Sequence, residues 1–198
     1  MGEVARAILY RRPRVRVRGG LIAVLAATTV TAPLSAQKVT PAPARPAAPP
    51  SDARGRVFHD SLFQRLAGDW TMTGAVRGRP VTYRLRAEWV LEHTFFKLEM
   101  QDAAEPPQYQ AIVYIGFDDV GDRYVAHWID IFGGRFSETL GYGTREGNSV
   151  RFEFEYPEGP FHTTFILDDA TKRWRIEMKD RGAEGAWREF ATYLLERH

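Results

Sequence analysis

Hydrophobic and polar residues alternate along much of the chain after Trp70. The segment 81–89 is the clearest example, with apolar residues at every odd position and polar residues at every even one. The segments 150–156 and 173–179 follow the same period of two. This alternation predicts strands with one buried and one solvent-exposed face, which is typical of antiparallel sheets.

Less regular segments are expected to complete the sheet. They lie at about 70–77, 94–101, 109–117, 123–132, 135–144, 160–168 and 186–196. Turn-forming sequences such as Gly133-Gly134 separate them. We therefore predict an all-β fold of about ten strands joined by short connections. Sequential hairpins favour an up-and-down antiparallel β-barrel, because closure removes exposed strand edges, and a β-sandwich is the alternative.

A short helix is predicted before the first strand, over residues 57–67. Phe58, Leu62 and Leu66 recur at the spacing of one helical face. Gly68 follows where a left-handed C-terminal cap would lie.

The N-terminal part of the chain has the composition of an export signal. Residues 1–20 carry six arginines and one glutamate, the apolar run 21–27 follows, and Leu34-Ser35-Ala36 offers small residues for cleavage. We predict a signal peptide over 1–36, a Pro/Ala-rich linker over 37–56 and a barrel domain over 57–198. The protein is expected to be exported to the periplasm or outside the cell, with no membrane span after cleavage.

Charge and cysteine content exclude several classes of function. Without residues 1–36 the chain holds 21 basic and 24 acidic residues, a net charge of −3, so we expect no nucleic-acid partner. The chain has no cysteine. This rules out disulfides, thiolate metal sites, thiol catalysis and lipid attachment at a cysteine.

Motifs for common enzyme chemistry are also absent. The sequence holds no Gly-x-Ser-x-Gly, His-Glu-x-x-His, phosphate loop, dinucleotide fingerprint or EF-hand loop. None of the five histidines pairs with another at metal-ligand spacing, so neither a metal site nor a cofactor is predicted. The paired acids at 118–119 and 168–169 are interpreted as turn residues rather than calcium ligands.

Two acids are candidates for a site inside the barrel. Asp130 shares one side of its predicted strand with Trp128, and Glu138 shares one side of the next with Tyr142. If these sides face inward, both carboxylates lie among apolar side chains, where burial raises the pKa of an acid. The alternative is that they point outward or pair with an arginine. Trp89, Trp128 and Tyr142, together with Tyr83 and Tyr156, are candidates to line a ligand pocket, or are plain core.

Gly68-Asp69-Trp70, at the start of the first strand, resembles the Gly-x-Trp signature of lipocalins. That resemblance implies that Trp70 packs at the closed base of the barrel against an arginine of the last strand. Arg197 is the first candidate for this partner, and Arg188 is the second. Related nitrobindin barrels bind haem through a histidine, so an inward His127 or His162 would be a candidate haem ligand.

A longer stretch resembles a bacterial family catalogued as domain of unknown function 1579. It comprises Gly116-Phe117-Asp118-Asp119, Tyr124-Val125 and Trp128-Ile129-Asp130, with the block 91–96 before it and Glu177-Met178 after it. The resemblance covers about residues 64–198. The chain departs from the family pattern at Phe117, where the family has Tyr, and at Asp119, where it has Asn. It also lacks most of a Gly/Pro-rich segment after the first strand. The family implies a lipocalin-like barrel and supplies no catalytic residues.

Three hypotheses for the function follow. The first is an exported protein that binds a small apolar or amphipathic molecule in a barrel cavity. The second is a non-catalytic structural or interaction domain of the cell envelope, with a filled interior and an exposed apolar patch. The third is an enzyme that uses Asp130 or Glu138 as general acid or base.

Overall fold

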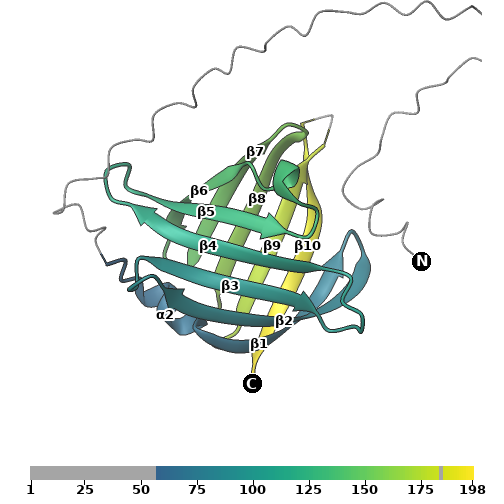
Figure 1. Cartoon of the computed structure of the whole chain (residues 1–198), viewed down its shortest axis with the longest axis horizontal. Coiled ribbons are helices and arrows are strands. Elements are labelled where there is room, and N and C mark those ends of the chain that lie inside the picture. Colours follow the sequence, from purple (N-terminus) through teal and green to yellow (C-terminus); the bar gives the residue numbers. More distant parts are fainter. Residues whose placement is uncertain (1–56, 183–184) are drawn as a thin grey trace, which may run out of the picture. The chain divides into compact units, whose positions relative to one another are not determined.

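The computed structural model describes residues 57–182 and 185–198, which form one short helix and a barrel of ten antiparallel strands (Figure 1). The predicted signal peptide (1–36) and linker (37–56) lie outside the described residues. The elements are α2 (Ser61–Leu66), β1 (Gly68–Val76), β2 (Arg79–Val90), β3 (Phe95–Asp102), β4 (Gln110–Asp118), β5 (Arg123–Asp130), the 3₁₀ helix η1 (Gly134–Phe136), β6 (Leu140–Glu146), β7 (Ser149–Tyr156), β8 (Gly159–Leu167), β9 (Trp174–Arg181) and β10 (Trp187–Arg197).

The connectivity is up-and-down throughout. Each strand pairs with its neighbours in sequence, and β1 closes the barrel by pairing with β10, from Trp70 opposite Arg197 to Val76 opposite Ala191. The predicted barrel is therefore confirmed, and the alternative sandwich is wrong. We call the end with α2 and Trp70 the base, and the end with Val76 and Asp130 the mouth. No helix in the described ranges is long and apolar enough to span a membrane.

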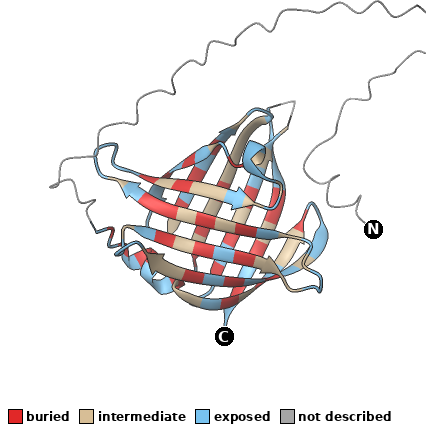
Figure 2. Ribbon diagram, in the orientation of Figure 1, coloured by how far each residue is buried: buried red, intermediate tan, exposed pale blue. Residues whose placement is uncertain are grey.

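Burial follows the alternation seen in the sequence (Figure 2). In β7, Val150, Phe152 and Phe154 are buried, while the intervening charged residues are exposed. The same pattern in β2 and β9 sends their apolar side chains into the barrel interior. The core thus consists of the inward-facing positions of the strands.

The helix is shorter than predicted, because an aspartate fixes its start. The Oδ1 of Asp60 accepts hydrogen bonds from the backbone N–H of Leu62 (2.7 Å) and Phe63 (2.9 Å), so Asp60 is the N-cap. Phe58 lies before the helix. The cap predicted at Gly68 is wrong, since this residue opens β1 with a φ of +131°, and a Cβ there would lie 2.7 Å from Arg197 Nη1.

The base of the barrel is filled by aromatic side chains around α2. The ring of Phe63 has no exposed surface, and its centroid lies 5.4 Å from that of Phe96, 5.9 Å from Tyr124 and 6.1 Å from Phe165. Phe58 adds a second layer by stacking on Phe117, 5.9 Å away. The plug is therefore built from the helix and from several strands.

Trp70 and Arg197 join the plug to the closing strand. The guanidinium of Arg197 lies 4.3 Å from the centre of the Trp70 ring and donates to the backbone oxygens of Arg65 (2.8 Å) and Ala67 (3.0 Å). Trp70 Nε1 donates to the oxygen of Leu66 at 2.7 Å. Together these bonds satisfy carbonyl groups at the end of α2.

In β6 the aromatic residue Tyr142 does not face the interior, although its type suggests that it would. In β6, Gly141 and Gly143 face the interior, and a Cβ on them would lie 2.5 Å and 2.7 Å from the rings of Phe154 and Phe152. Tyr142 therefore points outward. The two phenyl rings of β7 occupy the interior space that β6 side chains would otherwise need.

The barrel wall is weakest between β5 and β6. Their ladder pairs only Tyr124–His127 with Gly143–Leu140, whereas β4 and β5 pair over Ala111–Asp118 and Arg123–Asp130. The β5–β6 connection, which contains η1, departs at the mouth beyond this short ladder. We call this place the seam. Trp128 and Asp130 lie on its β5 side, paired with β4 alone.

Candidate functional site

Polar side chains from several elements meet inside the mouth. They are Tyr83 of β2, Tyr109 just before β4, Trp128 and Asp130 of β5, and Tyr193 of β10. We call them the mouth cluster. Each strand residue among them occupies an inward position, because its neighbours two residues away toward the base (Leu85, Ala126 and Leu195) are buried core residues. The cluster is therefore a polar group in an otherwise apolar interior.

The aromatic rings of the cluster lie close together. The Tyr83 ring centre lies 5.7 Å from that of Tyr109 and 5.9 Å from that of Tyr193. Trp128 Nε1 donates to the Tyr109 hydroxyl at 3.0 Å, and Tyr193 donates to the hydroxyl of Tyr83. Phe132 packs on the outer side of Tyr109, with ring centres 6.0 Å apart.

Asp130 supplies the charge of the cluster. Its Oδ1 accepts from the backbone N–H of Phe132 at 3.0 Å. Burial raises the pKa of this carboxyl, and hydrogen bonds from Phe132 and Tyr109 offset the rise only in part. Within 57–182 and 185–198, no lysine or arginine forms an ion pair with Asp130. The charge is thus held by neutral donors.

The tyrosines of the cluster remain neutral over a wide pH range. Burial, with a smaller contribution from the charge of Asp102, raises the pKa of Tyr83 to about 12. Burial raises the pKa of Tyr193 further still, and burial together with the charge of Asp130 raises that of Tyr109. These hydroxyls therefore act as hydrogen-bonding groups rather than as bases at ordinary pH.

The β3–β4 loop holds Tyr109 in place. The carboxylate of Asp102 accepts from the backbone N–H groups of Ala104 and Gln108, both at 3.1 Å. The backbone N–H of Asp102 in turn donates to the oxygen of Tyr109 at 2.9 Å. The sequence therefore folds this loop around one aspartate, which sets Tyr109 at the start of β4.

A further polar atom faces the interior from another part of the wall. Thr163 of β8 is 1% exposed, and its Oγ1 has no hydrogen-bond partner in the described structure. An unpaired buried hydroxyl is unfavourable in an apolar core. It gives the interior a second hydrogen-bonding position that the protein does not use itself.

The comparisons with known proteins concern the barrel. Residues 58–197 match the family described as "Protein of unknown function (DUF1579)". The chain belongs to the DUF1579 family. The match covers the barrel strands and the plug helix of this DUF1579 protein. No curated protein matches the chain.

Among solved structures, the protein is similar to the crystal structure of Rv2717c from M. tuberculosis. The two share 14% identity with a TM-score of 0.47, over 71% of this chain and 99% of the other.

The structure brings three of the residues predicted from the sequence into one place and separates the others. Tyr83, Trp128 and Asp130 lie together in the mouth cluster. Trp89 lies at the base instead, where its ring packs 4.9 Å from Phe96 and its Nε1 donates to Gln64 at 2.8 Å.

The hypothesis that Glu138 and Tyr142 face the interior is wrong. Glu138 is an exposed residue of the connection between η1 and β6. Tyr142 is 43% exposed on the outer face, where Arg123 lies 4.0 Å from its ring centre. The glycines at 141 and 143 explain the error, since the inward positions of this strand carry no side chain.

Tyr109 and Tyr193 were not predicted as site residues. Tyr193 lies between Thr192 and Leu194 in β10, and this local sequence gives no sign that it is more than a core residue. Tyr109 precedes β4 and lies two residues before Ala111, which faces the interior, so the alternation of the strand places Tyr109 on the inward side as well. That parity, extended one step into the loop, is the signal that could have identified it.

The histidines that were considered as haem ligands both lie on the outer face. His127 Nε2 lies 2.7 Å from the backbone oxygen of Ser137. His162 stacks on Trp187 with ring centres 3.7 Å apart, and its Nε2 lies 3.2 Å from Glu153. Neither side chain lies in the interior.

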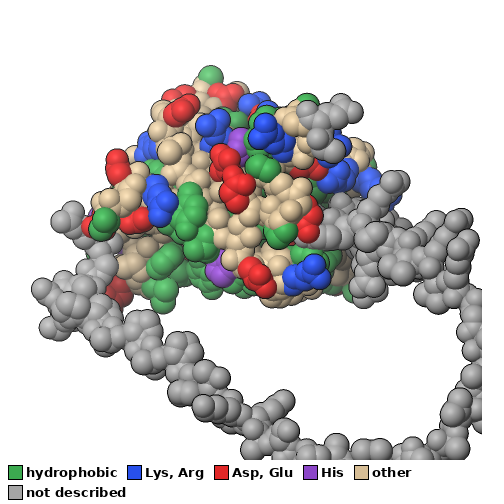
Figure 3. Space-filling model, turned by 90° about the horizontal axis from the view of Figure 1, so that it is seen from above, with side chains coloured by type: hydrophobic (Ala, Val, Ile, Leu, Met, Phe, Trp, Pro, Cys, Tyr) green, Lys and Arg blue, Asp and Glu red, His purple; other side chains and the backbone are tan. Residues whose placement is uncertain are grey.

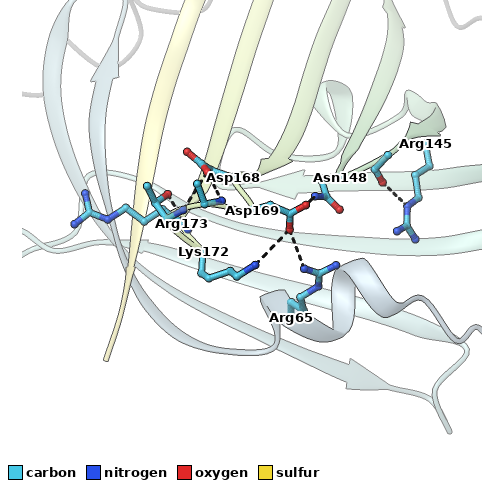
Figure 4. Close-up of polar contacts among 10 residues, drawn as sticks. Arg65, Arg145, Asn148, Asp168, Asp169, Lys172 and Arg173 are labelled. Carbon is cyan, nitrogen blue, oxygen red and sulfur yellow. Dashed lines mark hydrogen bonds and ion pairs between the residues drawn. The ribbon is translucent and has the colours of Figure 1, made fainter.

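The paired acids hold turns, as Figure 4 shows for the β8–β9 turn. Asp168 Oδ1 accepts from the backbone N–H of Ala170 at 2.8 Å and of Thr171 at 3.1 Å. Asp169 bonds to Asn148, Lys172 and Arg65, so it ties this turn to α2. In the part of the chain that the structure describes, no group of three His, Asp or Glu residues could hold a metal ion.

A hollow of about 400 Å³ lies on the outer face of β3 to β6. Its lining is mostly apolar and comprises Leu91, Phe95, Tyr114, Val125, His127 and Leu140. Figure 3 shows hydrophobic side chains gathered in patches among charged ones on the side of the barrel seen from above. We call the surface lined by the six residues from Leu91 to Leu140 the outer hollow.

Proposed function

We propose that this DUF1579 protein binds a small amphipathic molecule at the mouth of its barrel. The observation that carries the proposal is Asp130, a partly buried carboxylate held by neutral groups inside an apolar wall. A buried charge without an opposite charge destabilises a fold. Carboxylates whose pKa is raised by burial are often found at functional sites.

The two ends of the barrel support a single route to the site. The base is filled by α2 and the aromatic rings around Phe63, so a molecule reaches the interior from the mouth. The seam places Trp128 and Asp130 where the wall has the fewest backbone hydrogen bonds. Movement of the β5–β6 connection would open this part of the wall without breaking the longer ladders.

The proposed setting is outside the cytoplasm. The arginine-rich start of the chain and the apolar run 21–27 support export, and the Pro/Ala-rich residues 37–56 would act as a spacer. A barrel with a polar cluster at its mouth would then hold its ligand in the periplasm or outside the cell.

Native mass spectrometry of the protein purified from its source cells tests the proposal. We expect a small molecule to remain bound to the wild-type protein and to Tyr114→Ala, whose substitution lies in the outer hollow. Trp128→Ala should lose it. Masses that equal those of the bare polypeptides for all three proteins, with no retained molecule, would contradict the proposal. A haem absorption band in the same material would contradict it as well, by identifying a different ligand.

A second candidate function is an interaction module of the cell envelope. The outer hollow favours it, since Phe95 (38% exposed) and Leu140 (39% exposed) present apolar surface there. Leu140→Ser should weaken binding to a protein partner and leave small-molecule binding at the mouth unchanged. Co-purification of wild-type and variant protein with envelope proteins separates the two functions.

A further inference from the structure

We infer that the molecule bound at the mouth carries a cationic amine head, as an alkylammonium ion does. This inference rests on the proposed function and names the chemistry of its ligand. It is drawn from the aromatic faces, the charges and the remaining hydrogen-bonding capacity of the mouth cluster.

Aromatic rings are gathered beside Asp130 at the mouth. Three tyrosines lie with successive ring centres 5.7 Å and 5.9 Å apart, and the indole of Trp128 is bonded to one of them. The faces of such rings attract a cation, and aromatic cages recognise alkylated ammonium groups. Ordinary apolar packing would not require four polar-tipped rings at one point.

The charges around the cluster favour a cation. Asp130 lies beside Tyr109, and the charge of Asp102 acts on Tyr83. The nearest arginines of the mouth on the β10 side, Arg77 and Arg188, both pair with Asp180. An anionic head would meet two carboxylates, while a cationic head would supply the charge that Asp130 lacks.

The hydrogen bonds of the cluster leave free acceptor positions on the carboxylate of Asp130. Trp128 already donates to Tyr109, Tyr193 donates to Tyr83, and the N–H of Phe132 donates to Asp130. A carboxylate has more acceptor positions than these bonds fill. The site is therefore matched to a ligand that donates hydrogen bonds or carries positive charge.

The apolar part of the ligand would lie against flexible side chains. Met72 pairs with Tyr83 across β1 and β2, and Met100 pairs with Ala111 across β3 and β4. Both methionines are buried next to the cluster on its base side. Thioether side chains adapt their shape, so they can make room for a short alkyl chain.

Three amphiphiles of equal chain length test the inference: octyltrimethylammonium, octanol and octyl sulfate. Binding is measured by isothermal titration calorimetry below the micelle concentrations, with tryptophan fluorescence as a second readout. We expect the cation to bind about tenfold or more tightly than octanol, and octyl sulfate to bind most weakly. Asp130→Asn should remove the preference for the cation and leave octanol binding unchanged.

Two further variants locate the binding. Asp69→Asn, an exposed carboxylate at the base, should bind all three compounds as the wild-type protein does. Leu140→Ser should also retain the preference, because its side chain is exposed on the outer face, away from the mouth cluster. Equal binding of the three amphiphiles at the mouth would overturn the cationic head and leave the proposed function intact. Binding of none of them, together with the absence of any co-purified molecule, would reject both.

Discussion

Asp60 at the base and Asp130 at the mouth are two carboxylates withdrawn from solvent in opposite surroundings. Asp60 caps α2, accepts from the Tyr124 hydroxyl at 2.6 Å and pairs with Arg145 at 3.1 Å. Asp130 accepts from one backbone N–H and from Tyr109, and no cation balances it in the described ranges. One end of the barrel therefore has its charge compensated, and the other end does not.

The difference separates stability from function. At the base, Asp60 caps the plug helix and joins it to Tyr124 and Arg145 of the wall, so the carboxylate stabilises the fold. At the mouth, the carboxylate is surrounded by groups that hold it without neutralising it. A residue that weakens the free protein in this way is expected where the protein binds something.

The largest effect on stability is expected from a substitution in the plug at the base. Phe63→Ala removes a fully buried ring that contacts four others, so we expect a loss of about 3–5 kcal/mol in the free energy of unfolding. Urea denaturation measures it. Leu194→Ala, at a position 47% exposed, should change stability by less than about 0.5 kcal/mol. Similar losses for both variants would show that α2 is not part of the core.

Asp60→Asn is expected to have the next largest effect. It leaves Arg145 and Tyr124 facing a neutral amide and weakens the cap of α2, so a loss of about 2–3 kcal/mol is expected. Calorimetry should show a melting temperature lower by about 10 °C. Asp69→Asn serves as the control and should melt as the wild-type protein does.

Arg197→Lys tests the link between Trp70 and the plug. Lysine keeps the charge but cannot donate to two carbonyl oxygens from one planar group while it covers the Trp70 ring. We expect a loss of about 1–2 kcal/mol by chemical denaturation. A variant as stable as the wild type would show that the contacts of Arg197 do not stabilise the plug.

Asp130→Asn is expected to stabilise the protein, whereas the preceding substitutions destabilise it. Burial raises the folded-state pKa of this carboxyl above 3.8, so the folded state gives up stability as pH rises through the raised pKa. Asparagine can still accept from Phe132, and above that pH the variant should be more stable by about 0.5 kcal/mol, after allowance for solvent screening. The gain should vanish in strong acid. A destabilised variant at neutral pH would show that the mouth carboxylate supports the fold.

Tyr83→Phe should give the smallest effect, visible only in alkali. The pKa of Tyr83 is about 12 in the folded protein against 10.0 for an exposed tyrosine, so stability is lost as pH rises between these values. Without this hydroxyl, the decline in melting temperature above pH 10 should be shallower than in the wild-type protein. Tyr114→Phe, on the outer face, is the matched control.

The strands could be predicted because their buried and exposed residues alternate, and the barrel followed from the number and order of the hairpins. The orientation of β6 could not, since its inward residues are glycines and the reason for them lies in Phe152 and Phe154 on the neighbouring strand. Parity placed Trp128 and Asp130 on the same side of one strand, but it did not decide whether that side faces the interior, because the strand is apolar on both faces. Tyr109 and Tyr193 join them only through the closure of the barrel, which no local pattern describes.

The seam also has a consequence for how the protein behaves in concentrated solution. A barrel closed over its full height has no free strand edge, but β5 beyond His127 has no partner strand on its β6 side. The β5–β6 connection covers this stretch, where His127 contacts the backbone of Ser137 and Ile129 and Ile131 are exposed. Uncovered edges of this kind recruit strands from other molecules. The connection thus protects the protein from self-association at the same place where it would have to move to admit a ligand.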